Sequence, residues 1–387
     1  MQDVALFNPA PGLQMMCVGI LLAGLPLVWW WRRHRHDSSA RRLQALTLLT
    51  LFLTFDLVLF GAFTRLTDSG LGCPDWPGCY GSASPLGAQQ QITAAQTAMP
   101  TGPVTHGKAW IEMVHRYLAT GVGVLIMVLA WRTWRAHRQG QGEAIHPLWP
   151  VLTLVWVCLQ GAFGALTVTM KLFPAIVTLH LLLGIGLLAL LTVQAVRYEG
   201  WRSVPVPVAA RAALWLALVL LSIQIALGGW VSTNYAVLAC QDFPTCNGQW
   251  WPEFHAQGFE IWRPLGHDGQ GQLLTAGALV TVHLVHRSMA AVVLPVLLWT
   301  GARLTRLKGL VLAGRVLLAL SFLQLLTGLG NVVLGWPLLA AVMHTGGAAA
   351  MVMVLCWALS RSRSSVAGAE ASFDKSVQSF KDSRPAA

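Results

Sequence analysis

The feature that most constrains this chain is a series of nine apolar runs of about 18 residues or more, the length that a helix needs to cross a bilayer. We predict transmembrane helices over residues 14–31, 43–63, 109–131, 150–170, 175–196, 212–232, 279–301, 309–331 and 337–359. Only 11% of the residues are charged, against roughly 25% in soluble domains. The sequence therefore predicts an all-α polytopic membrane protein, and it excludes an ordinary soluble enzyme and a disordered chain.

The net charge of +11 does not indicate nucleic-acid binding, because the basic residues cluster in short links between apolar runs. Most of them lie in links 32–42, 132–148, 197–211 and 302–308 and after residue 360. The alternate links are much poorer in Lys and Arg, so the positive-inside rule predicts a periplasmic N-terminus and a cytoplasmic C-terminus. Since we see no transit peptide, we expect a bacterial cell inner membrane.

One pattern occurs twice along the chain. Gly61 and the pair Cys73 and Cys79 have counterparts, at identical spacing, in Gly228 and the pair Cys240 and Cys246. The dipeptides Val114-His115, Leu159-Gln160 and Leu179-His180 likewise match Val285-His286, Leu323-Gln324 and Met343-His344, in the same order and at nearly the same offset. The repeat predicts duplicated four-helix bundles that form an eight-helix core.

This duplication sets the expected domains. Residues 43–200 form an N-terminal four-helix unit and residues 201–360 a C-terminal four-helix unit. Residues 1–42 add an extra N-terminal transmembrane helix and a basic link, and residues 361–387 a disordered cytoplasmic tail. Because each unit has an even number of helices, we expect both units to insert in the same orientation. An axis along the membrane normal should then relate them.

Four histidines occupy equivalent places in the repeat: His115, His180, His286 and His344. Each lies about six or seven residues, or roughly 9–11 Å, from the outer start of its predicted helix. Ionisable residues are costly in a membrane, which favours a functional role. Paired histidines from facing helices are typical of haem ligation on both faces of the iron, whereas zinc sites usually gather three or four ligands. We predict that all four ligate haem iron.

Two kinds of charged neighbour accompany these histidines. Arg116 and Arg287 directly follow a histidine, so they either pair with haem propionates or extend to the lipid headgroups. Glu112 shares a helix face with His115, which makes it either a proton-transfer residue or an interfacial carboxylate. Its equivalent in the second unit is His283, which we expect to be solvated or interfacial. This asymmetry predicts that one unit reacts and the other carries electrons.

The paired cysteines lie in the two long loops predicted to face the oxidising compartment. Each Cys-x5-Cys therefore predicts a disulfide, Cys73 with Cys79 and Cys240 with Cys246. The expected role is to constrain each loop, with a redox role as the alternative. Asp56 lies in the middle of an apolar run, and we expect it to face the interior of the bundle.

Together these motifs resemble the haem A synthase family. The residues that carry the resemblance are Thr64-Arg-Leu-Thr-Asp-Ser-Gly-Leu-Gly-Cys73, Glu112-Met-Val-His-Arg116, Leu179-His180, Val285-His-Arg287 and His344. The resemblance spans about residues 43–359. It implies an oxidoreductase that converts haem O to haem A by oxidising a ring methyl to a formyl group, for use by haem–copper oxidases.

The resemblance also implies a role for each unit. The N-terminal unit would hold the substrate haem between His115 and His180 with Glu112 beside it, and the C-terminal unit a b-type haem between His286 and His344. It further links Cys73 and Cys79 to the substrate site. The expected partners are haem O, its producing enzyme, an unidentified electron donor and membrane lipid, with a homo-oligomer possible. The alternative function is a quinol-linked two-haem cytochrome b that does not modify haem.

Overall fold

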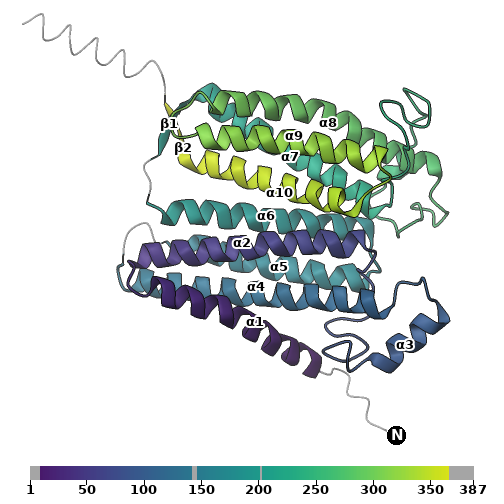
Figure 1. Ribbon diagram of the computed structural model, residues 1–387, viewed down its shortest axis with the longest axis horizontal. Coiled ribbons are helices and arrows are strands. Elements are labelled where there is room, and N and C mark those ends of the chain that lie inside the picture. The colour runs from purple at the N-terminus through teal and green to yellow at the C-terminus, as the bar shows by residue number, and fades with distance from the viewer. Residues whose placement is uncertain (1–8, 142–145, 201–202, 366–387) are drawn as a thin grey trace, which may run out of the picture.

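The computed structural model describes residues 9–141, 146–200 and 203–365, which contain nine helices long and apolar enough to cross a membrane (Figure 1). They are α1 (Ala10–His34), α2 (Ser39–Leu66), α4 (His106–Arg138), α5 (Leu148–Thr169), α6 (Pro174–Tyr198), α7 (Val208–Thr233), α8 (Ala276–Leu304), α9 (Val311–Val333) and α10 (Leu338–Arg361). All nine predicted transmembrane helices are confirmed, and the chain is an all-α polytopic membrane protein.

Several helices extend beyond the apolar runs that predicted them. The largest difference is at the end of α4, which continues to Arg138 although the apolar run ends at residue 131. There Arg135 lies over the ring of Trp131 and Arg138 over that of Trp134, at 5.8 and 4.4 Å from the centroids. Such aromatic and basic residues belong at the membrane interface. An apolar run therefore reports the thickness of the hydrocarbon layer and underestimates the length of the helix.

Four short elements were not predicted. The helix α3 (Gln89–Ala98) and the 3-10 helix η1 (Ala256–Phe259) lie in the two long loops, and β1 (Val204–Pro207) pairs in parallel with β2 (Ser362–Ser365). The predicted disorder of the tail is wrong for residues 361–365, because they complete α10 and pair with the link before α7. The rest of that tail, residues 366–387, lies outside the described residues.

The helices repeat one arrangement in an N-terminal unit (α2, α4, α5 and α6) and a C-terminal unit (α7, α8, α9 and α10). The two units meet where α6 packs against α10, and each of these helices also contacts the other unit, α6 through α7 and α10 through α2. Both long loops, residues 67–105 and 234–275, lie at the same end of the bundle, which we call the loop end (Figure 1).

Two hydrogen bonds at the loop end connect residues that are equivalent in the repeat. At the loop end, a guanidinium nitrogen of Arg65 donates to the carbonyl of Ser232 at 2.6 Å, and Asp68 accepts a hydrogen bond from the hydroxyl of Tyr235 at 2.6 Å. In each of these contacts the two residues are 167 positions apart and are equivalent in the repeat. Contacts between equivalent residues are expected next to an axis that relates two copies, and the division of the chain into two four-helix units stays a prediction.

The extra helix α1 packs along α4. Gly19 makes this close approach possible, because a Cβ at that position would lie 2.5 Å from the Cγ2 of Thr120. At its loop end, α1 touches the loop of the first cysteine pair, where Pro11 lies beside Gly78. The helix outside the repeat therefore covers both α4 and the Cys73–Cys79 loop.

Candidate functional site

The four predicted iron ligands lie in equivalent helices of the two units. His115 and His180 are on α4 and α6, and His286 and His344 are on α8 and α10. All four side chains are half-buried. The predicted depth of six or seven residues fits α6 and α10, whose histidines are six residues from the helix start. The predicted depth is too small for His115 and His286. Their helices, α4 and α8, begin three residues before the apolar runs from which the depth was counted.

A glycine on a neighbouring helix faces each imidazole. A Cβ at Gly61 or Gly164 would lie 3.0 or 3.1 Å from Cε1 of His115 or His180, respectively. In the second unit, a Cβ at Gly228 or Gly328 would lie 3.0 or 3.2 Å from Cε1 of His286 or His344. We call these four positions the glycine notches. A side chain larger than hydrogen at any of the four positions would crowd the imidazole that it faces. The same arrangement occurs in both units.

The donor set of each unit fits haem. Each unit contributes two imidazoles, those of His115 and His180 in the N-terminal unit and those of His286 and His344 in the C-terminal unit. The described part of the chain contains no group of three or more His, Cys, Asp and Glu residues that could hold a metal ion. Zinc sites take three or four protein ligands, whereas two imidazoles complete the axial coordination of a haem iron. The geometry therefore favours a macrocycle over a bare metal ion.

Both predicted cysteine pairs are joined, as Cys73–Cys79 and Cys240–Cys246. In the first loop the carboxylate of Asp75 accepts hydrogen bonds from the backbone N–H groups of Tyr80 at 2.6 Å and Gly81 at 2.7 Å. Tyr80 and Gly81 have φ of 48° and 71°, as in the type I′ turn of a tight hairpin. The carboxylate of Asp75, which lies between the two cysteines, thus binds the turn that directly follows Cys79.

The second loop repeats this design. Asp242, the equivalent of Asp75, accepts hydrogen bonds from the backbone N–H groups of Asn247 and Gly248, whose φ values are 53° and 79°. The hydroxyl of Thr245 also donates to this carboxylate at 2.5 Å. These hydrogen bonds hold the pKa of Asp242 below its usual value. The repeat therefore extends to the polar contacts that shape each loop.

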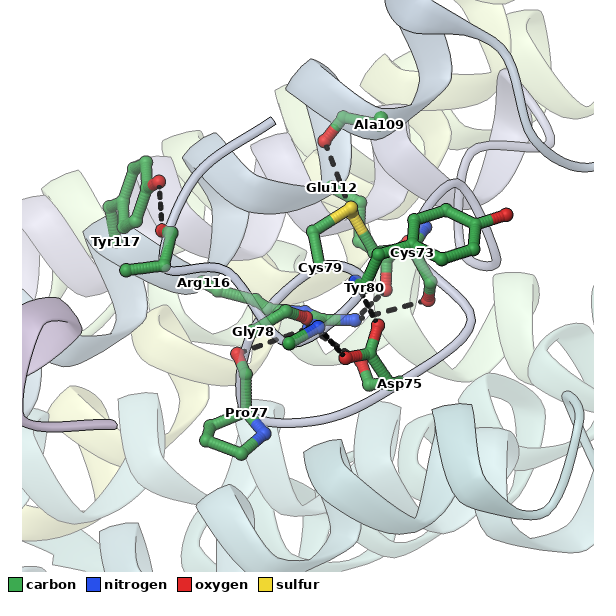
Figure 2. Close-up of a disulfide and its surroundings, with 12 residues drawn as sticks. Cys73, Asp75, Pro77, Gly78, Cys79, Tyr80, Ala109, Glu112, Arg116 and Tyr117 are labelled. Atoms are coloured by element: carbon green, nitrogen blue, oxygen red, sulfur yellow. Dashed lines mark hydrogen bonds and ion pairs between the residues drawn. A yellow bond between two sulfur atoms is a disulfide. The ribbon is translucent and has the colours of Figure 1, made fainter. Parts of the chain in front are cut away.

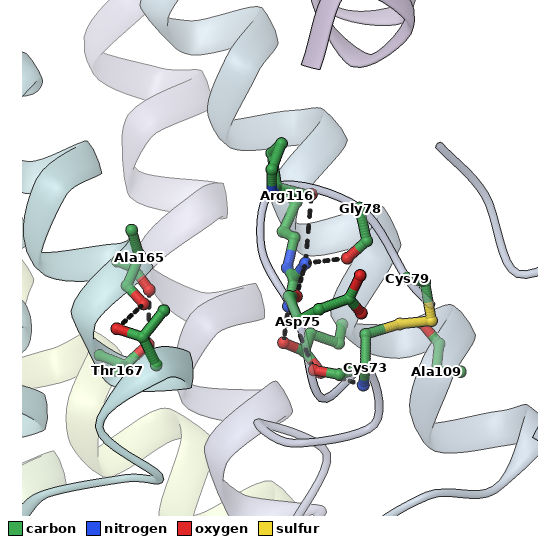
Figure 3. Close-up of polar contacts among 12 residues, drawn as sticks. Cys73, Asp75, Gly78, Cys79, Ala109, Arg116, Ala165 and Thr167 are labelled. Atoms are coloured by element: carbon green, nitrogen blue, oxygen red, sulfur yellow. Dashed lines mark hydrogen bonds and ion pairs between the residues drawn. A yellow bond between two sulfur atoms is a disulfide. The ribbon is translucent and has the colours of Figure 1, made fainter. Parts of the chain in front are cut away.

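Arg116 anchors the first loop to α4. Its Nη1 donates to three loop carbonyls, those of Asp75 at 2.9 Å, Pro77 at 3.2 Å and Gly78 at 2.6 Å (Figure 2). Figure 3 shows the contacts to Asp75 and Gly78 from a second direction, with the guanidinium inside the curve of the loop. Arg116 directly follows His115, so the loop is held one residue from a predicted iron ligand.

Arg287 makes the equivalent contacts in the C-terminal unit. Its Nη2 donates to the carbonyl of Asp242 at 2.5 Å and its Nη1 to that of Thr245 at 3.0 Å. These two acceptors are the equivalents of Asp75 and Gly78. Hydrogen bonds to loop carbonyls differ from both roles expected for these arginines, which were pairing with haem propionates and extension to the lipid headgroups. The contact with haem propionates stays a prediction for both Arg116 and Arg287.

Glu112 also belongs to the first anchor. Its side chain is buried, with Oε1 paired to Arg116 and Oε2 accepting a hydrogen bond from the backbone N–H of Cys73 at 2.7 Å (Figure 2). Because the carboxylate is buried, it is not an interfacial residue in water. Its proposed part in proton transfer stays a prediction, whereas its contacts connect α4 to the disulfide loop.

The structure corrects the expectations for His283 and Asp56. His283 is not solvated: it is buried, and its Nδ1 lies 2.9 Å from the carbonyl oxygen of Ala236 at the start of the second loop. Asp56 does not face the bundle interior, because it is exposed on α2. The buried face of α2 includes Thr50 and Thr54 instead, and Asp56 is two residues, about 200° of helical rotation, beyond Thr54.

The chain is similar to known proteins over most of its length. Residues 44–356 match the family model described as cytochrome oxidase assembly protein. A heme A synthase of Shewanella oneidensis is 39% identical over 314 residues, which cover 79% of this chain and 92% of that protein. Heme A synthases of Halalkalibacterium halodurans and Caulobacter vibrioides are 26% and 29% identical, over 82% and 78% of this chain and 96% and 90% of those proteins. The chain belongs to the cytochrome oxidase assembly protein family.

Proposed function

We propose that this chain is a haem A synthase that oxidises a ring methyl of haem O to a formyl group and so supplies haem A to haem–copper oxidases. The observation that carries the proposal is the repeated pair of histidines, each facing a glycine notch at an equivalent position of a duplicated helical unit. The names of the relatives support the same reaction, and neither they nor the geometry favours the two-haem electron carrier.

The two units take different roles in this proposal. His115 and His180 bind the iron of the substrate haem in the N-terminal unit, and His286 and His344 bind a resident b-type haem in the C-terminal unit. When bound, the resident haem supplies one-electron transfer. The asymmetry between Glu112 and His283 supports this division, because among the residues that the structure describes a buried carboxylate occurs only in the unit assigned to the substrate.

The protein's own residues hold the substrate unit in shape. The Phe60 ring stacks on the His115 imidazole, with ring centroids 6.2 Å apart and planes 10° apart. Glu112 and Arg116 bind the Cys73–Cys79 loop to α4 at the loop end. We propose that this buried network positions His115 and closes the loop end of the unit, with Glu112 as the candidate for proton transfer through its carboxylate oxygens.

The proposed setting is a bacterial cell inner membrane with the loop end on the periplasmic side. The clustering of Lys and Arg in the links at the other end supports this orientation. Haem O is the substrate partner, and the enzyme that produces haem O is the expected source. The electron donor and a homo-oligomeric state are further partners to be tested.

Histidine variants test the assignment of the two units. We expect His115→Ala or His180→Ala to abolish haem A formation while one haem B per chain remains, because the C-terminal ligands are intact. We expect His286→Ala or His344→Ala to lose the haem B. Chromatography of the extracted haems measures both results. Haem A formation by His115→Ala or His180→Ala, or an unchanged haem B content in His344→Ala, would contradict the assignment.

A further inference from the structure

The histidines of the C-terminal unit have polar partners on their ring nitrogens. The hydroxyl Oγ1 of Thr327 lies 2.9 Å from Nδ1 of His344 and 2.8 Å from the carbonyl oxygen of Leu323. A hydroxyl carries one proton, and the nearby carbonyl can only accept it. The hydroxyl oxygen therefore accepts a hydrogen bond from Nδ1–H of His344. This tautomer leaves the Nε2 lone pair free to bind iron.

His286 has a partner of the same kind. The side-chain nitrogen of Gln224 lies 3.1 Å from Nδ1 of His286, and the Oε1 of Gln224 is buried without a hydrogen-bond partner among the described residues. The same nitrogen donates to the backbone carbonyl oxygen of His286 at 3.2 Å, so Gln224 contacts both the ring and the backbone of this histidine. Gln224 thus constrains the orientation of His286, as Thr327 constrains that of His344.

The N-terminal unit lacks both partners. Gln224 lies one helical turn before the notch Gly228, and the residue in that place before Gly61 is Leu57. Thr327 directly precedes the notch Gly328, and the residue that directly precedes Gly164 is Phe163. Neither the leucine nor the phenylalanine side chain can form a hydrogen bond.

The ring nitrogens of the N-terminal histidines reflect this difference. The Nδ1 atoms of His115 and His180 are buried and have no hydrogen-bond partner within the part of the chain that the structure describes. The side-chain nitrogen of Gln160 lies 3.5 Å from Nε2 of His180, the ring nitrogen assigned to iron. The two units therefore share their histidines but differ in the partners of Nδ1.

We propose that Gln224 and Thr327 are positioning residues that lock the two C-terminal histidines for a resident haem, and that Leu57 and Phe163 leave the N-terminal pair unlocked so that a haem can be exchanged. This inference rests on the proposed function, which assigns the substrate to the N-terminal unit. A hydrogen bond from the second ring nitrogen fixes the tautomer and orientation of a histidine ligand and raises its basicity. A substrate that must leave as product needs ligands without that constraint.

Haem dissociation measures this difference without any turnover. The full-length protein in detergent, saturated with haem B, is mixed with excess apomyoglobin, and haem transfer is followed by absorbance. We expect a fast phase from the N-terminal unit and a slow phase from the C-terminal unit, and His344→Ala identifies the slow phase by removing it. Loss of a partner to a ligand costs about 10- to 100-fold in metal affinity. Thr327→Val and Gln224→Leu should accelerate the slow phase by about that factor.

Three further variants separate positioning from general packing. Thr327→Ser keeps the hydroxyl and should restore the slow phase. Thr192→Val is the matched control, because Thr192 is buried and donates to the carbonyl of Leu188 at 2.7 Å in the same way, with no histidine involved. The double variant Leu57→Gln/Phe163→Thr introduces both partners into the N-terminal unit and should slow the fast phase about 10-fold or more.

The reduction potential of the C-terminal haem is a second readout. Since a hydrogen bond from Nδ1–H makes the imidazole a stronger electron donor to ferric iron, Thr327→Val should raise the potential, and Thr327→Ser should return it to the original value. An unchanged slow phase and potential in Thr327→Val would overturn the inference while leaving the proposed function intact. A slow phase that persists in His344→Ala would instead overturn the assignment of the resident haem.

Discussion

At the scale of single residues, the glycine notches connect the sequence to the proposed haem sites. A glycine in the middle of a helix costs about 1 kcal/mol of helix stability relative to alanine, and the chain has such a glycine facing each of the four histidines. At each notch an added Cβ would lie 3.0 to 3.2 Å from Cε1 of the facing imidazole. The glycines therefore lower the local stability of the helix but leave space beside each histidine that is predicted to bind iron.

Alanine at one notch should displace its ligand. Gly328→Ala would bring a Cβ within 3.2 Å of Cε1 of His344, whereas in the control Gly330→Ala the nearest atom is 3.9 Å away. We expect Gly328→Ala to lower the haem B content of the purified protein at least about twofold and Gly330→Ala to leave it unchanged, since only the first change crowds the imidazole. Equal haem contents in the two variants would contradict a spatial role for the notch.

The sequence predicted which positions of the two units carry equivalent residues better than it predicted the contacts of those residues. The repeat pointed to His115 and His286 because equivalent positions in both copies carry an unusual residue. The contacts of Arg116 and Arg287 with loop carbonyls depend on how each loop folds back over its helix, which neighbouring residues do not encode. The burial of His283 depends on the same folding of the loop.

At the scale of elements, hydropathy predicted the nine transmembrane helices because the bilayer imposes one length and one composition on them. The same physics explains what was missed. The helix α3 lies in a loop, and β1 and β2 pair between segments far apart in the chain, so neither leaves an apolar run in the sequence. The role of α1 was also beyond the sequence, because its contacts with α4 depend on three-dimensional packing.

Crowding of the contact between α1 and α4 should loosen the first loop. In Gly19→Leu the new side chain would collide with Thr120, whereas Gly24→Leu has no atom within 4 Å of the new Cβ and serves as the control. We expect overpacking to destabilise α1 docking by about 1–3 kcal/mol. The rate at which dithiothreitol reduces Cys73–Cys79, followed by alkylation and mass spectrometry, should rise in Gly19→Leu alone. Equal rates in both variants would contradict the covering role of α1.

Removal of one anchor should expose the disulfide that it holds. Arg116→Leu deletes the hydrogen bonds to the carbonyls of Asp75 and Gly78 and leaves the buried Glu112 without its cation. We expect the reduction of Cys73–Cys79 to accelerate about 10-fold or more, while Cys240–Cys246 keeps its rate because Arg287 is intact. Equal acceleration of both disulfides would indicate general unfolding and contradict a local anchor.

At the scale of the whole molecule, the two four-helix units pack against each other. The junction at the loop end joins the units through Asp68, which accepts hydrogen bonds from Tyr235 at 2.6 Å and Lys108 at 3.1 Å. Partial desolvation would raise the pKa of Asp68, but these hydrogen bonds and the nearby cations outweigh it and hold the pKa below the usual value.

The lowered pKa of Asp68 predicts a pH dependence of stability. The carboxylate contributes its stability above the pKa of the unfolded chain, about 3.9, and loses it as the pH falls through the lower folded value. Asp68→Asn should therefore lower the free energy of unfolding at pH 7 by less than about 1 kcal/mol, because the group is exposed, and this appears as a slightly lower thermal midpoint. The difference should shrink below about pH 4. A difference that is as large at pH 3 as at pH 7 would contradict this account.

The central claim is that one unit holds a resident haem while the other unit converts its haem. The most direct measurement is chromatography of the haems extracted from the purified full-length protein, expressed with and without a source of haem O. We predict one haem B per chain under both conditions and haem A only when haem O is supplied. Two haem B per chain under both conditions, with no haem A, would contradict the account and support the electron carrier instead.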